Sequence, residues 1–335
     1  MELDGRFGKK GLKTYVLRLA LQTGFAAFLI WIGFQFSRYF RAVETGSLPL
    51  PDRPTGAEGF LPVSGLMGLL DWFYQGQLNS VHPAATVLVL AFTLISLVFR
   101  KSFCSWICPV GLLSESLARW GRRIFGRNFR IWKWLDIPLR SVKYALLLFF
   151  ALSIAMMSAE ALQAFIHSPY NKVSDLKMYA FFADPSVLAG SILAVLAIGS
   201  VFVHGFWCRY LCPYGAWLGL FSWASPVSIR RSKGTCTDCG LCDRVCMARL
   251  PVSSKDRILS VECTGCLDCV ASCPVPLTLK AGTRKHPLRL QYFAGGLLAV
   301  FLLIYLAARV SGYWQSGVEG GEVVHLFRIM DQLSH

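Results

Sequence analysis

Five apolar stretches alternate with polar segments along the chain. They contain no Asp, Glu, Lys or Arg and cover residues 19–37, 83–99, 144–159, 185–203 and 290–308. A helix needs roughly 17–25 mostly apolar residues to cross the hydrocarbon core of a bilayer. The two shortest stretches are flanked by Lys and Arg, whose long side chains can reach the membrane interface. The pattern therefore predicts five transmembrane helices.

The segments between these stretches carry shorter helical patterns. Residues 59–70 are apolar but too short to span a bilayer, so we expect an interfacial or re-entrant helix there. Residues 110–125 have apolar positions at helical spacing with Arg on the other face, which predicts an amphipathic helix along the inner membrane surface. Pro109 suits the first turn of that helix, and Asp184 with Pro185 suits the start of the fourth span.

Composition and charge distribution agree with a membrane protein. Hydrophobic residues make up 54% of the chain and charged residues only 16%, against about 25% charged residues in soluble domains. The N-terminal segment and residues 100–143 and 204–289 together hold 27 Lys and Arg, and the remaining segments hold 7. By the positive-inside rule, the three basic segments are cytoplasmic and the others face outward. We therefore interpret the net charge of +15 as a topology signal and not as a nucleic-acid-binding surface.

All twelve cysteines lie in the segments predicted to be cytoplasmic. That compartment is reducing, so metal ligation is favoured over disulfide bonds. Two groups have the spacing C-x₂-C-x₂-C-x₃-C, and two have the spacing C-x₃-C-P. The groups are Cys236, Cys239, Cys242 and Cys246 (the first run); Cys263, Cys266, Cys269 and Cys273 (the second run); Cys104 and Cys108; and Cys208 and Cys212.

The two runs predict two [4Fe–4S] clusters, because eight thiolates at this spacing are the ligands of bacterial two-cluster ferredoxins. In that arrangement each run gives three ligands to one cluster and its fourth ligand to the other. We therefore expect Cys273 to complete the cluster of the first run and Cys246 to complete that of the second. Gly240 and Gly265 supply conformational freedom beside the ligands. Zinc explains the pattern less well, because it takes four ligands from two separated C-x₂-C pairs.

The two C-x₃-C-P motifs leave three interpretations open. In a helix, i and i+4 spacing puts the two cysteines of each motif on one face, Cys104 with Cys108 and Cys208 with Cys212. If the two halves of the chain pack together, four thiols meet near the inner membrane surface. These thiols can ligate a further iron–sulfur centre, form a redox-active dithiol or disulfide set, or serve as buried structural cysteines at helix ends. The motifs recur 104 residues apart and both have aromatic neighbours, which suggests a parallel repeat.

The predicted topology leaves a distance to be crossed. All the cysteines lie at one face, whereas the hydrocarbon core is about 30 Å thick, so electrons need a membrane quinone or a cofactor in a partner subunit. His82 and His167, near the outer face, are candidate hydrogen-bond partners of a quinone carbonyl, although a solvated loop histidine is the default interpretation of each. His204 is close to Cys208 in the sequence and is a candidate for tuning a nearby centre.

The sequence F-C-S-W-I-C-P-V-G at residues 103–111 and C-R-Y-L-C-P-Y-G at 208–215, followed by the two runs, resembles the NapH-type and NosR-type membrane polyferredoxins. The resemblance covers most of the chain. It implies an inner-membrane iron–sulfur protein that moves electrons between the quinol pool and an outer redox enzyme or maturation system. NosR-type members also carry an outward FMN-binding domain. The longest outer segment here, residues 38–82, is too short for one, which suggests a separate flavin- or haem-bearing partner.

Together these features predict an all-α membrane bundle of about five transmembrane helices with an inserted small α+β ferredoxin domain of the bacterial two-cluster type. We expect a membrane domain over residues 1–227, a cytoplasmic ferredoxin domain over 228–287, and a fifth helix with an outer tail over 288–335. The expected location is the bacterial inner membrane, with the N-terminus cytoplasmic.

Three functions fit this architecture. The favoured one is electron transfer between the quinol pool and a redox partner through two [4Fe–4S] clusters, as in a quinol dehydrogenase subunit. One alternative is a relay from a cytoplasmic donor to an outer flavoprotein without its own quinone site. The other is a cluster-based redox sensor.

Overall fold

The structure is a computed structural model that describes residues 9–129, 131–284 and 286–329, so the extreme N-terminus lies outside it. It divides into two compact units. One comprises Met1–Ala26, Phe92–Leu147 and Leu196–Phe301 and contains all twelve cysteines; we call it the cysteine unit. The other comprises Ala27–Ala91, Leu148–Val195 and Leu302–His335, and we call it the cysteine-free unit.

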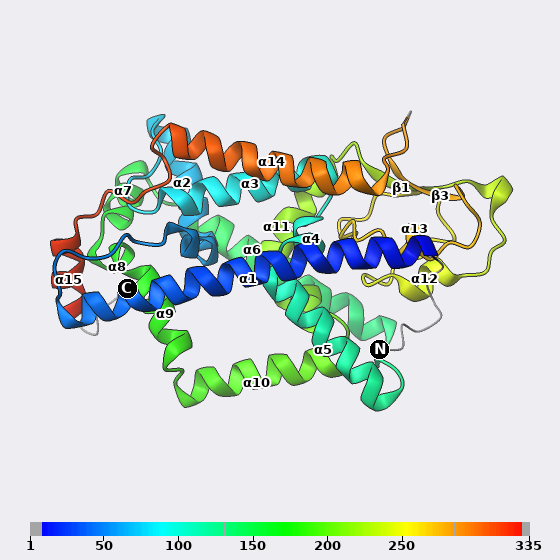
Figure 1. The fold of residues 1–335 in the computed structure, drawn as a ribbon, viewed down its shortest axis with the longest axis horizontal. Coiled ribbons are helices and arrows are strands. Elements are labelled where there is room, and N and C mark those ends of the chain that lie inside the picture. The colour runs from blue at the N-terminus through cyan, green and yellow to red at the C-terminus, as the bar shows by residue number, and fades with distance from the viewer. Residues whose placement is uncertain (1–8, 130, 285, 330–335) are drawn as a thin grey trace. The chain divides into compact units, whose positions relative to one another are not determined.

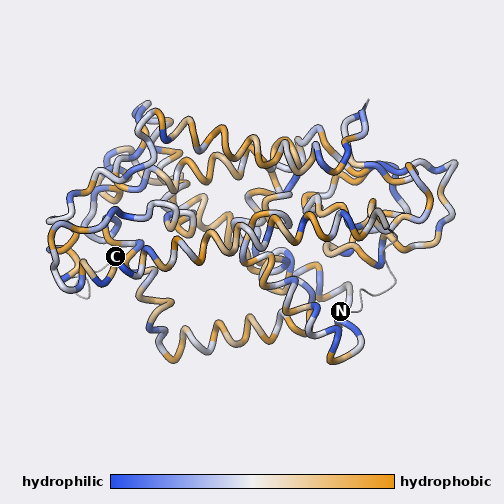
Figure 2. Tube along the Cα trace, in the orientation of Figure 1, coloured by the Kyte–Doolittle hydropathy of each residue, from blue (hydrophilic) through white to orange (hydrophobic). Residues whose placement is uncertain are grey.

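Five helices have residues in both units, and they contain the five predicted apolar stretches apart from a few end residues (Figure 1). Their bounds are Lys9–Thr45 for α1, Pro83–Phe99 for α3, Lys133–Ala155 for α6, Val187–Phe202 for α10 and Leu290–Val310 for α14. Figure 2 shows hydrophobic residues along most of α3, α10 and α14. Continuous apolar surface on a helix is the property that a lipid environment requires.

Length limits how many of these helices can cross a bilayer alone. Three segments are long and apolar enough, namely Gly11–Thr45 in α1, Trp134–Ala155 in α6, and α14. α10 follows α9 (Ser174–Ala183) after a bend of 74°, and this pair is either one broken span or a re-entrant loop. α3 has 17 residues, which is the lower limit for a span. By length and composition, the described residues therefore contain three candidate spans, or four if the bent pair is one span, and a fifth stays a prediction.

The segments predicted as outer loops contain more helix than the sequence indicated. A 3₁₀ turn, Thr55–Phe60, and α2, Pro62–Gln75, cover the predicted interfacial segment. α7 (Ala159–Ile166) and α8 (Pro169–Lys172) precede α9 without a long loop, and α15 (Gly320–Arg328) follows α14. Short helices of this kind are hard to detect because each offers only one or two turns of periodic pattern.

The start of α10 differs from the prediction. Asp184 does not cap this helix, because its N–H donates to the carbonyl oxygen of Ala180 and closes α9. Ser186 is the capping residue, and its Oγ accepts a hydrogen bond from the N–H of Ala189 at 3.3 Å. Pro185 lies in the bend between α9 and α10, where its missing N–H removes no helical hydrogen bond.

His82 belongs to a buried polar cluster of the cysteine-free unit. Its side chain is fully buried, with Nδ1 3.2 Å from Glu58 Oε1 and Nε2 2.7 Å from the carbonyl oxygen of Asn171. Burial alone would lower the pKa of His82. The Glu58 carboxylate outweighs burial and raises this pKa above its usual value. A solvated loop histidine is therefore the wrong interpretation of His82, because its two ring nitrogens face protein groups. His167, at the end of α7, is exposed as that interpretation expects.

The cysteine unit contains a small antiparallel sheet with short helices beside it. The strands are β1 (Ser228–Arg231), β2 (Arg257–Ile258) and β3 (Leu279–Gly282), in the order β2-β1-β3. Ile229 pairs with Ile258 on one side and with Ala281 on the other, and all three are buried. α12 (Leu241–Val245) and α13 (Asp268–Ala271) each contain one cysteine. This α+β arrangement lies within the predicted 228–287 domain.

The amphipathic helix is α5, Pro109–Phe125, with Pro109 in its first turn as predicted. Its apolar side chains Leu113, Trp120 and Ile124 are exposed, whereas Glu115 and Ala118 are buried. This is the reverse of a helix in a soluble domain. An outward apolar face is the arrangement that a helix lying on a membrane surface requires.

Candidate metal centres

The two runs fold into tight turns beside short helices. Gly240 has φ 67° and Gly265 has φ 62°, in the left-handed region that glycine adopts without steric cost. Asp238 and Leu267 adopt the same region, with φ 51° and φ 64°. Such values are uncommon for residues with a side chain, and backbone strain of this kind collects at functional sites. The conformational freedom predicted at the two glycines is thus used by both turns.

Two cavities in the cysteine unit are each lined by four cysteines. The lining of the first includes Cys236, Cys239, Cys242 and Cys273. The lining of the second includes Cys246, Cys263, Cys266 and Cys269. Each cavity therefore takes three cysteines from one run and the fourth from the other.

These donor sets suit a cluster better than a single ion. Among the described residues, no three His, Cys, Asp or Glu side chains lie close enough together to hold one metal ion. A cubane is larger, because each cysteine binds a different iron at its own corner. Burial raises the pKa of Cys242 and Cys246 to about 11, so a positively charged core is needed to keep these sulfurs as thiolates at neutral pH. The N–H of Leu250 donates to Cys246 Sγ at 3.4 Å, as donors to ligating sulfurs do.

The two C-x₃-C-P motifs share one backbone hydrogen bond. In each, the N–H of the second cysteine donates to the carbonyl oxygen five residues earlier, from Cys108 to Phe103 and from Cys212 to Trp207, both at 3.0 Å. Wide turns of this type occur frequently at functional sites. The second cysteine then caps a new helix, which is α5 in the first motif and α11 (Pro213–Ser222) in the second. A continuous helix through both cysteines is therefore the wrong description, because the proline of each motif begins another helix.

The four cysteines of these motifs lie in one partly buried neighbourhood, which we call the four-cysteine site. Burial, with a smaller contribution from the nearby Cys212 sulfur, raises the pKa of Cys104 to about 12 and that of Cys108 to about 11. Burial also raises the pKa of Cys208 well above its usual value, with contributions from the other three sulfurs. Cys212 Sγ accepts a hydrogen bond from the N–H of Gly215 at 3.2 Å. The structure thus brings together the cysteines that are 104 residues apart in the sequence.

The glycine three residues after each second cysteine allows a close approach of the chain. A Cβ atom at Gly111 would lie 2.2 Å from the carbonyl oxygen of Cys104, so the first motif requires glycine there. At Gly215 the nearest atom to such a Cβ would be Cys212 Sγ at 3.5 Å, which is ordinary contact. The two motifs therefore share this hydrogen bond, but the chain is more tightly packed at Gly111 than at Gly215.

The first motif binds the loop that carries the second run. Ser105 Oγ donates to the carbonyl oxygen of Thr264 at 2.8 Å, and Trp106 Nε1 donates to that of Gly265 at 3.1 Å. Thr264 and Gly265 lie between Cys263 and Cys266, which line the second cavity. Trp106 is fully buried, so this contact is part of the core of the unit.

The second motif binds another part of the rim of the same cavity. Arg209 Nη1 donates to the carbonyl oxygen of Ala248 at 2.9 Å, two residues after Cys246. By contrast, Cys239 of the first cavity is exposed to solvent. The second cavity therefore faces the four-cysteine site, and the first cavity is the more accessible of the two.

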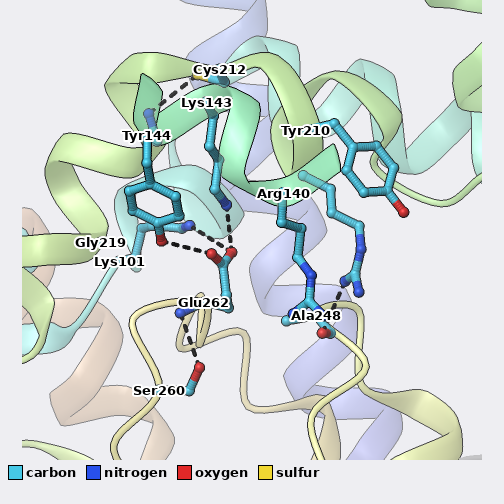
Figure 3. A network of polar contacts seen from close by, with 12 residues as sticks. Lys101, Arg140, Lys143, Tyr144, Tyr210, Cys212, Gly219, Ala248, Ser260 and Glu262 are labelled. Atoms are coloured by element: carbon cyan, nitrogen blue, oxygen red, sulfur yellow. Dashed lines mark hydrogen bonds and ion pairs between the residues drawn. The ribbon is translucent and has the colours of Figure 1, made fainter. Parts of the chain in front are cut away.

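A polar network beside the four-cysteine site was not anticipated from the sequence (Figure 3). Glu262 Oε2 lies 2.6 Å from Lys143 Nζ and 3.7 Å from Lys101 Nζ, and Tyr144 donates its hydroxyl hydrogen to Glu262 Oε1 at 2.7 Å. Burial alone would raise the pKa of Glu262. The ammonium groups of Lys101 and Lys143 outweigh burial and lower this pKa to about 2. Extension of these lysines to the membrane interface was the wrong interpretation, because both are buried. Their position beside apolar stretches and the place of Glu262 next to Cys263 were the available signals.

A second carboxylate in this region also holds two cations. Asp136 Oδ2 lies 2.9 Å from Arg209 Nη2 and 2.7 Å from Arg140 Nη2, and Tyr210 donates to Asp136 Oδ1 at 2.6 Å. His204 does not join this network. Burial lowers the pKa of His204 to about 4, so it is neutral at physiological pH, and its tuning role stays a prediction.

Comparisons with known proteins agree with these sites. A family model described as a 4Fe–4S binding domain matches residues 81–128 and, a second time, residues 184–233. Each match contains one C-x₃-C-P motif, which supports the predicted repeat. A model described as a 4Fe–4S dicluster domain matches residues 228–275, which contain both runs. No solved structure gives a significant match.

Relatives cover most of the chain. It is 44% identical over 309 residues to YccM of Escherichia coli K12, an alignment that covers 90% of this chain and 87% of YccM. It is 28% identical over 211 residues to the ferredoxin-type protein NapH of the same organism, covering 61% of this chain and 60% of NapH. It is 29% identical over 223 residues to the regulatory protein NosR of Pseudomonas aeruginosa, covering 60% of this chain but only 30% of NosR.

Apolar helices joined to a dicluster domain define an iron–sulfur electron-transfer protein of the membrane. The repeated C-x₃-C-P motifs and the similarity to YccM, NapH and NosR identify the family more narrowly. The chain belongs to the NapH/NosR-type family of membrane polyferredoxins, as the sequence resemblance predicted.

Trp106→Phe tests the contact between the first motif and the second run. The substitution leaves the buried carbonyl oxygen of Gly265 without its donor, and we expect a loss of about 1–3 kcal/mol in the free energy of unfolding. Denaturant unfolding in detergent, followed by cluster absorption, measures the change. Trp120→Phe is the matched control, because Trp120 is 64% exposed. Equal losses in the two variants would show that the contact contributes nothing specific.

Proposed function

We propose that this protein transfers electrons between the membrane quinol pool and a redox partner through a chain of iron–sulfur centres. The observation that carries the proposal is the direct hydrogen bonding between the loop of the second run and the motif that contains Cys104. A ferredoxin domain held in this way has a short route from its inner cluster site to the membrane body. The family relationship supports electron transfer as the role.

Two [4Fe–4S] clusters occupy the two cavities in this proposal. Cys236, Cys239, Cys242 and Cys273 ligate the first cluster, and Cys246, Cys263, Cys266 and Cys269 ligate the second. When bound, such clusters accept and release single electrons. The chain's own part is to supply thiolates at fixed positions and backbone N–H donors to the sulfurs, and to exclude water from the inner site.

The four-cysteine site holds a further iron–sulfur centre in this proposal. Its four cysteines are partly buried in one neighbourhood, and the second cysteine of each motif lies at a helix N-terminus, where anionic sulfur is favoured. A redox-active dithiol set needs access for an exchanging thiol, which this partial burial restricts. The exposed first cluster site, the second cluster site and the four-cysteine site then form one path for electrons to or from the membrane body.

The proposed orientation places all these centres at the cytoplasmic face, with the last tail of the chain outside. The basic segments support this orientation through the positive-inside rule. Because the hydrocarbon core is about 30 Å thick, a quinone dissolved in the membrane or a cofactor in a flavin- or haem-bearing partner completes the path across it.

Exchange of electrons with quinone tests the function. In anaerobically purified protein in lipid nanodiscs, we expect a quinol analogue to reduce the clusters, or the matching quinone to reoxidise them after dithionite reduction. Electron paramagnetic resonance (EPR) and visible absorption record the change. Dithionite alone shows that the clusters are intact. If neither quinol nor quinone alters dithionite-competent clusters, the protein relays electrons to a partner without a quinone site of its own.

Cysteine-to-serine variants test the crossed ligand sets. Cys246→Ser should perturb the same EPR signal as Cys266→Ser, and Cys273→Ser should perturb the same signal as Cys239→Ser, because each pair lines one cavity. Serine is a poorer ligand for iron and shifts the spectrum of its own cluster first. The reverse pairing, in which Cys246→Ser resembles Cys239→Ser, would contradict the assignment.

Iron content tests the centre in the four-cysteine site. Two [4Fe–4S] clusters account for about eight irons per chain. We expect more than this in the unmodified protein, and a return to about eight in a Cys104→Ser, Cys208→Ser double variant that keeps both ferredoxin signals. Iron and sulfide analysis with EPR provides the measurement. About eight irons in both proteins would mean that the four cysteines hold no cluster.

A further inference from the structure

The charged residues beside the four-cysteine site do not balance one another. Lys101 and Lys143 share the carboxylate of Glu262, and Arg140 and Arg209 share that of Asp136. Four cations thus face two carboxylates. Each carboxylate carries one negative charge and so neutralises one cation, and the tyrosine hydroxyl groups that donate to Glu262 and Asp136 are neutral and add no charge.

Burial makes this imbalance costly. The side chains of Lys101 and Lys143 are 5% and 0% exposed, and that of Arg209 is 8% exposed. Water therefore screens these charges weakly, and an uncompensated buried charge is strongly unfavourable. A further anion near the two lysines would remove the cost.

The membrane cysteines are the groups that these lysines face. Lys101 lies three residues before Cys104, and the N–H of Cys104 donates to the Lys101 carbonyl oxygen at 3.3 Å, so this lysine begins the turn that carries the first motif. Figure 3 shows Lys143 and Cys212 on neighbouring helical segments, with Glu262 on the side of the ferredoxin loop. The excess positive charge thus lies between the four-cysteine site and the second run.

We propose that Lys101 and Lys143 are the counter-charges of an anionic iron–sulfur centre at the four-cysteine site and that they set its reduction potential. This inference rests on the proposed function, which places a centre there. An iron–sulfur core with four thiolate ligands is anionic and becomes more negative by one charge on reduction. Neighbouring cations stabilise the reduced form, and the Glu262 carboxylate opposes them. Neutral thiols or disulfides would need no excess of cations.

Two substitutions in the same network shift the potential in opposite directions. Lys143→Met removes a cation and should lower the potential by at least the equivalent of a tenfold change in equilibrium constant, which is about 59 mV for one electron. Glu262→Gln removes the opposing anion and should raise the potential. The measurement is an EPR-monitored redox titration of the full chain, following the signal that the Cys104→Ser, Cys208→Ser variant lacks. That signal separates the four-cysteine site from the cluster beside Glu262.

Further variants separate charge from packing. Lys143→Arg keeps the charge and should keep the potential near that of the unmodified protein, whereas Lys101→Met should lower it if Lys143→Met does not fold. Lys233→Met is the control for loss of one surface cation, because Lys233 is 69% exposed beside Asp256. It should leave the potential of the four-cysteine site unchanged.

The outcomes distinguish the two levels of the proposal. A lower potential in the lysine variants with a higher one in Glu262→Gln supports the counter-charge role. A signal that shifts in the same direction in all variants, or not at all, overturns that role and leaves the centre in place. An unmodified protein without any signal that depends on Cys104 and Cys208 overturns the centre itself, and the counter-charge role with it.

Discussion

The arrangement of the cysteine unit depends on the hydrogen bonds that two adjacent side chains, Ser105 and Trp106, donate to the loop of the second run. The donors lie between Cys104 and Cys108, and the acceptors lie between Cys263 and Cys266. Because a buried carbonyl oxygen without a donor is costly, this contact fixes the loop to the membrane motif. The ferredoxin domain is therefore not a separate module on a linker, and its inner cavity keeps a constant position relative to the four membrane thiols.

Charge compensation is the second constraint on this region. Buried thiols tend to stay protonated, and buried lysines are unfavourable alone, yet the structure brings both together beside Glu262 and Asp136. Each group reduces the desolvation cost of the others. The cysteine-free unit meets a similar problem with one buried pair, in which His82 Nδ1 lies 3.2 Å from Glu58 Oε1.

The sequence was sufficient for features that depend on local pattern. The spacing of the two cysteine runs predicted which cysteines lie together in each of the two ferredoxin cavities. The apolar stretches predicted the five helices that contain them. It was insufficient where a residue's role depends on distant partners. Lys143 resembles any cation at the end of a span, and only the fold shows that Glu262, 119 residues away, meets it. The course of each C-x₃-C-P motif was also missed, because i, i+4 spacing does not reveal that the proline restarts the helix.

The matched wide turns at Cys108 and Cys212 have a consequence for how the two halves of the chain have diverged. The positions between the cysteines correspond, Ser105 to Arg209 and Trp106 to Tyr210. In one copy they contact the middle of the second run, and in the other Arg209 contacts the residues that follow the first run. Two copies of one motif thus recognise two different edges of a single asymmetric domain. The ferredoxin insert is consequently held at two separate edges, one by each motif.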